Sequence, residues 1–110
     1  MYIATLKMTP PSREKQKVLV AFRAILSWAG RSPGCLECSF FAETEPDEAI
    51  LIVERWRSEE DLRRHLQSDT YRKILELVEL STEPPEIRFY RVVEESGLEL
   101  VEQVRGHETE

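Results

Sequence analysis

The sequence predicts one α+β domain in which strands and helical segments follow the order β-α-β-β-α-β. The chain has 110 residues, which suits one domain and leaves little room for a second. Four segments alternate apolar and polar residues as half-buried strands do, and the segments between them repeat apolar residues at helical spacing. Two halves of similar length in this order are typical of a ferredoxin-like antiparallel sandwich, here with an appended C-terminal strand.

The first half contains a strand, a helix and a second strand. Residues 2–8 alternate, with Tyr2, Ala4, Leu6 and Met8 on one face. The predicted helix begins near Ser12, a residue type that suits an N-cap. It ends before Gly30, which suits the C′ position. A turn at residues 31–34 leads into the second strand, where Leu36, Cys38, Phe40 and Ala42 share a face.

The second half contains two strands separated by two short helices. The polar turn at residues 45–48 predicts that strands two and three form an antiparallel hairpin. Strand three covers residues 49–57, with Ile50, Ile52, Glu54 and Trp56 on one side. Ser58 and Ser68 suit the N-caps of the two helices, and the second helix ends before Pro84. Residues 86–93 alternate again and form strand four.

The end of the chain is predicted to be separate from this unit. The turn at residues 94–97 precedes a short apolar segment, residues 98–104, which we expect to form a fifth strand. The residues from 105 to 110 are polar and are expected to fray. The chain therefore divides into a domain at residues 1–93 and a C-terminal strand and polar tail at residues 94–110.

The predicted sheet has apolar residues on both faces. The helices can cover one face only, yet the other face has Phe41 in strand two, and both faces of strand four are apolar. A sheet of this kind in a small chain needs a partner surface. We therefore expect a homodimer that packs sheet to sheet, with residues 98–104 pairing either within the subunit or across the dimer.

Charge and hydropathy exclude two classes of partner. The chain has 15 Lys and Arg and 21 Asp and Glu, a net charge of −6, and residues 76–110 alone have a net charge of −7. An acidic tail repels a phosphate backbone, so no nucleic acid is expected. No apolar run approaches the ~20 residues that span a bilayer, and no secretory signal pattern opens the chain. The sequence predicts a cytoplasmic protein with no membrane contact.

The two cysteines form a C-x-x-C motif at Cys35 and Cys38. A redox pair of this kind opens a helix, whereas this pair lies at the start of a predicted strand. Residues i and i+3 of a strand point to opposite faces about 10 Å apart, too far for a disulfide. A zinc site would need two further ligands, and the chain has only His65 and His107. We expect neither a redox pair nor a metal site.

Three segments of the sequence resemble the antibiotic biosynthesis monooxygenase family. They are residues 33–36, which begin Pro-Gly, residues 52–60 and residues 65–68. Family members have Pro-Gly before strand two, Glu-x-Trp at the end of strand three and a histidine nine residues after that tryptophan. Glu54, Trp56 and His65 occupy these last positions. The resemblance covers residues 1–93, and it implies a dimeric α+β barrel and, in some members, oxygenation of polycyclic phenols without metal or flavin.

The resemblance and the residue types together predict a cofactor-independent monooxygenase that acts with O₂ on a small aromatic hydroquinone or phenol. None of the four glycines belongs to a phosphate-binding loop, so no cofactor is expected. His65 is the candidate base because imidazole titrates near neutral pH, and Trp56 could place the substrate ring or donate its N–H. Glu54 should pair with an arginine or with His65, and Tyr71 and Tyr90 are the candidate pocket walls.

Two other interpretations stay open at this point. His65, Trp56 and the two tyrosines could be ordinary packing residues, in which case the protein is a non-catalytic, dimeric module that binds a small ligand. Haem degradation is the enzymatic rival, since related proteins on this fold have an asparagine on strand one, a tryptophan in the second helical region and an iron-ligating histidine ten residues later. This chain has no asparagine in residues 2–8, His65 at the tryptophan position and Leu75 at the ligand position.

Overall fold

The computed structural model describes residues 1–44 and 48–106 and confirms the predicted order of four strands and three helices from residue 2 to residue 91. The elements are β1 (Tyr2–Met8), η1 (a 3-10 turn, Ser12–Glu14), α1 (Lys15–Ala29), β2 (Cys35–Ala42), β3 (Ile50–Trp56), α2 (Glu59–Leu66), α3 (Asp69–Val78), β4 (Glu86–Arg91) and α4 (Leu98–Arg105). The tip of the β2–β3 hairpin, residues 45–47, and the tail, residues 107–110, lie outside the described residues.

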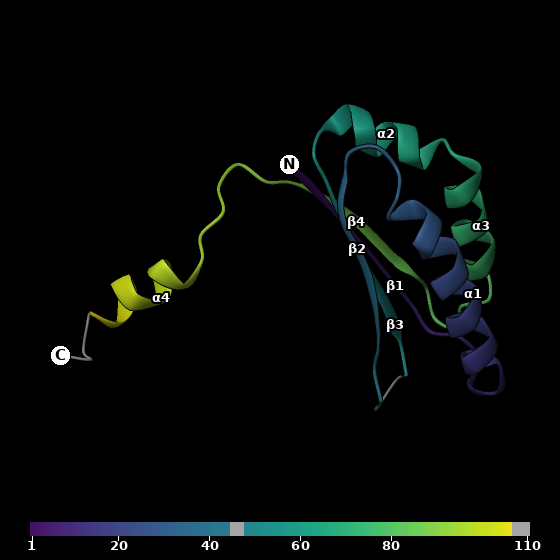
Figure 1. Cartoon of the computed structure of the whole chain (residues 1–110). Helices are drawn as coiled ribbons and strands as arrows, with labels where there is room; N and C mark the ends of the chain where they lie inside the picture. The colour runs from purple at the N-terminus through teal and green to yellow at the C-terminus, as the bar shows by residue number, and fades with distance from the viewer. Residues whose placement is uncertain (45–47, 107–110) are drawn as a thin grey trace.

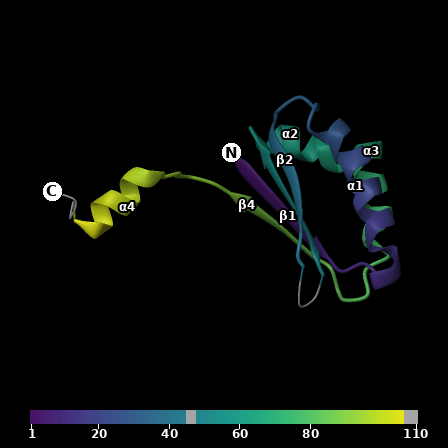
Figure 2. The same cartoon turned by 60° about the horizontal axis from the view of Figure 1, so that its bottom comes forward.

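The strands form one sheet in the order β2-β3-β1-β4, and each neighbouring pair is antiparallel. This order is the ferredoxin-like one, because β1 and β3 lie next to each other although a helix and a strand separate them in the sequence. α1, α2 and α3 all pack on the same face of the sheet (Figure 1 and Figure 2). The sheet therefore has one helix-covered face and one open face.

The helix-covered face contains the core. Alternate residues of β1 and β3 point toward the helices and are buried, as the period of two predicts. They meet the apolar sides of α1 and α3 in a cluster that includes Met8, Phe22, Ile50 and Ile74, each no more than 1% exposed. Each such side chain stabilises the fold by about 1.5–3 kcal/mol through burial. The core thus holds α1 and α3 against the sheet.

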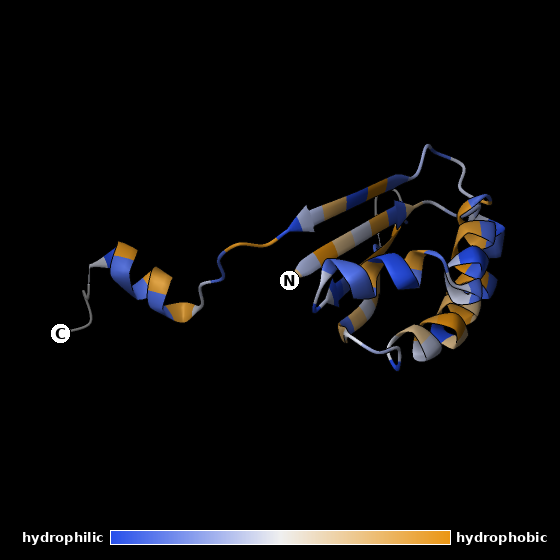
Figure 3. Cartoon of the chain, turned by 90° about the horizontal axis from the view of Figure 1, so that it is seen from above, coloured by the Kyte–Doolittle hydropathy of each residue, from blue (hydrophilic) through white to orange (hydrophobic). Residues whose placement is uncertain are grey.

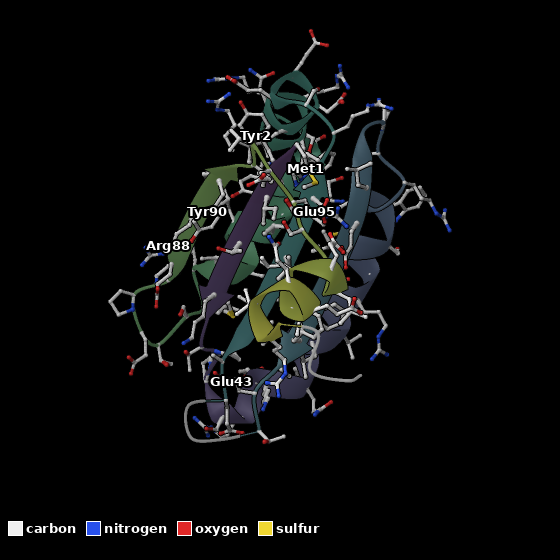
Figure 4. The ribbon with its side chains drawn as sticks, turned by 90° about the vertical axis from the view of Figure 1, so that its left-hand side faces the viewer. Met1, Tyr2, Glu43, Arg88, Tyr90 and Glu95 are labelled. Atoms are coloured by element: carbon white, nitrogen blue, oxygen red, sulfur yellow. The ribbon has the colours of Figure 1, made fainter. Side chains whose placement is uncertain are left out.

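The open face consists of the residues between those core positions. Ile3 of β1 lies opposite Arg55 of β3 and Tyr90 of β4, so these side chains share this face. Figure 4 views the molecule from this side and shows Tyr90 and Arg88 of β4 on it. Phe41 and Tyr90 are 57% and 48% exposed. The open face therefore has exposed aromatic side chains, as expected, but charged residues such as Arg55 and Arg88 lie among them.

Of the three N-cap residues predicted from the sequence, two cap a helix in the structure and one does not. The Ser58 and Ser68 hydroxyls accept hydrogen bonds from the backbone N–H groups of Asp61 and Tyr71, each at 3.1 Å, as N-caps do. The prediction for Ser12 is wrong, because Ser12 belongs to the turn η1 and its hydroxyl donates to Glu48 at 3.3 Å. α1 begins three residues later, at Lys15.

The end of α1 also differs in detail from the sequence prediction. Gly30 follows the helix directly, as expected, but its φ is −65°, which is right-handed backbone. The left-handed conformation that favours glycine at the C′ position is therefore absent at Gly30.

The predicted fifth strand at residues 98–104 is wrong, since these residues form the helix α4. Leu98 and Leu100 alternate as in a strand, but Val101 breaks the pattern. At 100° per residue the apolar side chains fall within an arc of roughly 160°; they are Leu98, Leu100, Val101 and Val104. Gly106 follows with a φ of 75°, the left-handed conformation that commonly ends a helix.

The C-terminal arm, defined here as residues 92–106, extends away from the rest of the chain. Figure 1 and Figure 2 show α4 standing clear of the sheet on the side opposite to the other helices. The radius of gyration is 16.6 Å, against about 13 Å for a compact chain of this length. Within the described parts of the chain, no helix is long and apolar enough to cross a membrane.

Candidate functional site

Glu54, Trp56 and His65 meet on the helix-covered face of the sheet. Glu54 and Trp56 are two residues apart in β3, so both point toward the helices. The Trp56 indole Nε1–H donates to Glu54 Oε1 at 3.1 Å. Ser58 then caps α2, and the helix directs His65 back so that its Nε2 lies 3.2 Å from Glu54 Oε2. We call Glu54, Trp56 and His65 the buried triad.

The Glu54 carboxylate is satisfied on both oxygens although it is buried. The exposed fractions are 4% for Glu54, 0% for Trp56 and 3% for His65. A buried carboxylate costs free energy unless it is paired and hydrogen-bonded. An ionised carboxylate only accepts, so within this pair His65 Nε2 is the donor and Glu54 Oε2 the acceptor. The expectation that Glu54 pairs with an arginine or with His65 is resolved in favour of His65.

Aromatic contacts hold the imidazole from two sides. The His65 ring stacks on Trp56 with centroids 4.5 Å apart, and the Tyr71 ring meets it edge-on at 5.2 Å. Trp56 stacks on His65 and has no exposed surface, so the expectation that it stacks on a substrate ring does not fit this arrangement. These contacts fix the orientation of the His65 ring toward Glu54.

Glu54 lines an apolar recess between the sheet and α3, which we call the Glu54 recess. Its walls come from β1, β3, α3 and β4: Ala4, Thr5, Leu6, Ile52, Glu54, Tyr71, Ile74, Ile87 and Phe89. The free volume is about 10 Å³, room for one water molecule. Ile87 and Phe89 share the inward face of β4, yet they are 38% and 46% exposed. The recess therefore opens at the β4 edge, where no helix covers the sheet.

His65 faces a second hollow on the other side of the triad. This hollow has a volume of about 140 Å³, and its walls are Ser32, Pro33, Trp56, Asp61, Arg64, His65, Ser68 and Thr70. The Glu54–His65 pair therefore separates two spaces, with the carboxylate on the recess side and the imidazole on the other.

The Pro33-Gly34 turn holds the end of β3 and the start of α2 in place. Gly34 has a φ of 85°, and a Cβ at this position would lie 2.2 Å from Cγ of Asp61, so only glycine fits. The Gly34 carbonyl accepts a hydrogen bond from Arg57 N at 2.8 Å. The Ser58 hydroxyl and the Arg64 guanidinium hold the pKa of Asp61 below its usual value. This turn fixes the direction in which α2 carries His65.

The two predicted tyrosines lie on different faces of the sheet. Tyr71 is 8% exposed and lines the recess, where burial and the Glu54 charge raise the pKa of its phenol. Tyr90 lies on the open face opposite Ile3, so one chain does not bring it to the triad. The sequence analysis missed Phe89, the neighbour of Tyr90 that does line the recess. Its signal was the strand period, which puts Phe89 on the same face as Ala4.

The cysteines stand apart from this chemistry. Both are free thiols, and burial raises the pKa of Cys38 to about 12 and that of Cys35 in the same direction. Among residues 1–44 and 48–106, no three His, Cys, Asp or Glu side chains are grouped so as to hold a metal ion.

The model of the family described as antibiotic biosynthesis monooxygenase matches residues 1–77. The chain belongs to this family. The matched residues run from β1 into α3, and they contain the whole buried triad and Tyr71.

Solved structures agree with this assignment at the level of the fold. A Deinococcus radiodurans protein described as a candidate antibiotic biosynthesis monooxygenase is 18% identical with a TM-score of 0.78, covering 88% of this chain and 97% of its own. Rv0793 from Mycobacterium tuberculosis is also 18% identical, with a TM-score of 0.75, covering 88% of this chain and all of its own. A conserved protein from Methanosarcina mazei is 24% identical, with a TM-score of 0.73 over 83% of this chain and 92% of its own.

One curated relative matches by sequence, an uncharacterized protein of Synechocystis. It is 26% identical over 86 residues, which make up 77% of this chain and 58% of that protein. The chain therefore spans less than two thirds of the relative's length.

Proposed function

We propose that the protein is a cofactor-independent monooxygenase that uses O₂ to oxidise a small aromatic hydroquinone or phenol. The observation that supports this proposal most directly is the Glu54–His65 pair at the inner end of an apolar recess. A carboxylate bonded to an imidazole can accept a phenolic proton, and apolar walls exclude water from the electron-rich ring that results. Membership of the antibiotic biosynthesis monooxygenase family agrees with this chemistry.

The reaction follows from the chemistry of an activated phenol. The Glu54 carboxylate accepts the phenolic proton and holds it until the peroxide formed in the later step takes it up, while the N–H groups of Trp56 and His65 keep the carboxyl group in place. The phenolate gives one electron to O₂, the two radicals combine at a ring carbon, and the resulting peroxide loses water. One oxygen atom stays in the product as a carbonyl and the other leaves as water, so the substrate itself is the reductant.

The site residues then have separate roles. The predicted role of His65 as the only proton acceptor changes, because Glu54 faces the recess and His65 stands behind it. Trp56 acts as a positioning residue, since its N–H and its ring hold Glu54 and His65. Tyr71 is a wall of the recess beside them. Because the recess has room for only about one water molecule, a substrate ring must displace the partly exposed side chains of Ile87 and Phe89 at its mouth to enter.

A haem-based mechanism has less support. The position of the iron-ligating histidine in haem-degrading relatives holds Leu75, which is 40% exposed on α3. The Glu54 recess also lacks a histidine among its lining residues. No resident flavin, haem or metal is part of this proposal.

We also propose that the working unit is a homodimer joined through the open faces of the two sheets. Apolar side chains of all four strands of the sheet lie on this face, and they are Ile3, Phe41, Leu51, Val53 and Tyr90. An apolar patch of this kind on a small chain marks an interaction surface. A copy seated there leaves the Glu54 recess unobstructed, because the recess lies on the other side of the sheet.

A non-catalytic binding module is the second candidate, and one observation favours it. Both oxygens of Glu54 are already hydrogen-bonded, so the triad is complete as a structural unit without any substrate. In that case the recess would bind an aromatic ligand without turnover.

The discriminating experiment measures O₂ consumption with a panel of hydroquinones and anthrones. Glu54→Gln keeps the shape of the side chain but removes the base, and it should lower the rate by a factor of about 10²–10⁴. Glu60→Gln, at an exposed position of α2, is the matched control and should leave the rate unchanged. Equal rates for the wild type and a folded Glu54→Gln variant would remove the carboxylate from the mechanism. Ligand binding with no O₂ uptake by any variant would favour the binding module.

A further inference from the structure

The strongest unexplained feature of the molecule is the C-terminal arm, residues 92–106. Its helix α4 has four apolar side chains that face solvent, with exposed fractions of 69% for Leu98, 48% for Leu100, 50% for Val101 and 76% for Val104. Figure 3 shows apolar residues recurring along α4 between polar ones, with no other element beside it. An eight-residue helix of this kind is not stable in water without a surface to pack on.

The arm leaves the domain on the side of the open face. Val92 N donates to the Met1 carbonyl at 2.8 Å, and Glu95 lies 3.5 Å from Arg55, a residue of the open face. In Figure 4, which views the open face, Met1 and Glu95 lie at this face and α4 lies in front of it. A second copy seated on the open face would therefore meet the arm first.

We propose that α4 is exchanged between subunits, so that each arm packs against the body of the partner chain. This inference rests on the proposed homodimer. It adds that the contact includes α4 of each chain packed against the body of the partner.

The area that a stable dimer needs supports the exchange. Strands of about seven residues with a rise of about 3.3 Å, in a sheet of four strands about 4.8 Å apart, give a face on the order of 400 Å². Two such faces bury roughly 900 Å², less than the 1,200–2,000 Å² of a typical stable interface. Two α4 helices, each about 12 Å long and about 10 Å wide, would add roughly 500 Å² with the surfaces they cover, which reaches that range.

Charge favours the body of the partner over its arm as the surface that α4 contacts. Residues 92–106 have four glutamates and one arginine, a net charge of −3, whereas residues 1–91, which form the body, have 14 basic and 15 acidic side chains and a net charge of only −1. Two acidic arms repel one another, so pairing of α4 with α4 is disfavoured. An acidic arm meets no such repulsion at the nearly neutral body of the partner.

Isotopic mixing tests the exchange directly. A photo-crosslinking residue is placed at Val101 in full-length unlabelled chains, which are then mixed with full-length ¹⁵N-labelled wild-type chains. After irradiation, mass spectrometry should find crosslinked peptide pairs of mixed isotope composition. The same residue at Gln103, on the polar side of α4, is the matched control and should give at least fivefold fewer mixed pairs. Crosslinks confined to one chain, or none, would overturn the exchange.

The dissociation constant of the dimer provides the second test, by analytical ultracentrifugation. Val101→Asp should raise it at least tenfold, and Gln103→Asp, which adds the same charge, less than threefold. A full-length chain that is monomeric at micromolar concentration would overturn the homodimer and the exchange together. A full-length dimer whose dissociation constant is the same for both variants would overturn only the exchange. Oxygen uptake is not read in either test, so the outcome is independent of the proposed catalysis.

Discussion

The two faces of the sheet differ in what surrounds them, although the same strands build both. On the helix-covered face, alternate residues of β1 and β3 are nearly all buried, and a charged glutamate there has two hydrogen-bond partners. On the open face, the residues between them stay partly exposed, and aromatic side chains such as Phe41 and Tyr90 face solvent. Because successive side chains of a strand point to opposite faces, the same strands place the buried triad on the helix-covered face and leave exposed side chains for assembly on the open face.

This difference predicts that mutations on the two faces have separable effects. Changes on the helix-covered face should act on stability and on the recess, and changes on the open face on dimer formation. Expressed as free energy, with about 1.4 kcal/mol for each tenfold change, the expected effects fall in the order below.

Removal of His65 should have the largest effect on stability. His65→Ala leaves the buried Glu54 carboxylate with one donor only, which should lower the free energy of unfolding by about 3–5 kcal/mol. His65→Gln keeps a donor within reach and should cost less. Urea unfolding followed by circular dichroism measures both. A loss below 1 kcal/mol for His65→Ala would mean that the pair contributes little to the fold.

A charge on the open face should affect assembly instead. Val53→Asp places a carboxylate among the apolar side chains of this face and should raise the dissociation constant of the dimer about 100-fold, or about 2.7 kcal/mol. Val20→Asp, on the exposed side of α1 at 60% exposure, makes the same chemical change outside the proposed interface. Sedimentation velocity at several concentrations measures both. Equal dissociation constants would place the dimer contact elsewhere.

Two neighbours in β4 allow the comparison within one strand. Phe89→Ala opens the mouth of the Glu54 recess and should change the affinity for aromatic ligands about tenfold, with little effect on the dimer. Tyr90→Ala should weaken the dimer by a similar factor and leave ligand affinity unchanged, because its side chain points to the other face. Titration with a fluorescent hydroquinone and ultracentrifugation measure the two properties. Parallel changes in both variants would contradict the separation of the faces.

The last effect is absent at neutral pH and concerns Cys38, which lies opposite Glu54 in the sheet. Its pKa is about 12 in the folded chain and 9.0 in the reference state. Between these values the unfolded chain loses the thiol proton and the folded chain retains it, so stability is lost as the pH rises from 9 to 12. Cys38→Ala should show a shallower decline in the urea midpoint over this window. Identical declines would mean that other groups, such as Tyr71, account for the pH dependence.

Much of the fold could be predicted from the sequence because its signals are local. Strand alternation in residues 2–8 and 50–56 and the serine caps at Ser58 and Ser68 depend on neighbouring residues only, and the structure confirms them. The prediction failed at residues 98–104, where a short apolar segment fits a strand and a helix almost equally well. For that segment the glycine at its end was better evidence for a helix than the apolar pattern was for a strand, because Gly106 ends the helix in the left-handed conformation.

The site was harder to predict than the fold. That Glu54 must be paired follows from its place among apolar residues, but the choice between an arginine and His65 depends on the direction of α2, which the Pro33-Gly34 turn sets through Asp61. The face on which Tyr90 lies depends on the register of β4 against β1. These are long-range relations that residue types and spacing alone do not encode.

The buried triad and Tyr71 all come from residues 54–71, a single stretch of β3, α2 and α3. Contacts between residues so close along the chain lose little loop-closure entropy, so they form early and quickly during folding. The site should therefore be among the first parts of the molecule to become ordered on the ribosome, before β4 and the arm are synthesised. Changes confined to residues 86–106 would then leave the buried triad and Tyr71 in place and act on the mouth of the recess and on the arm.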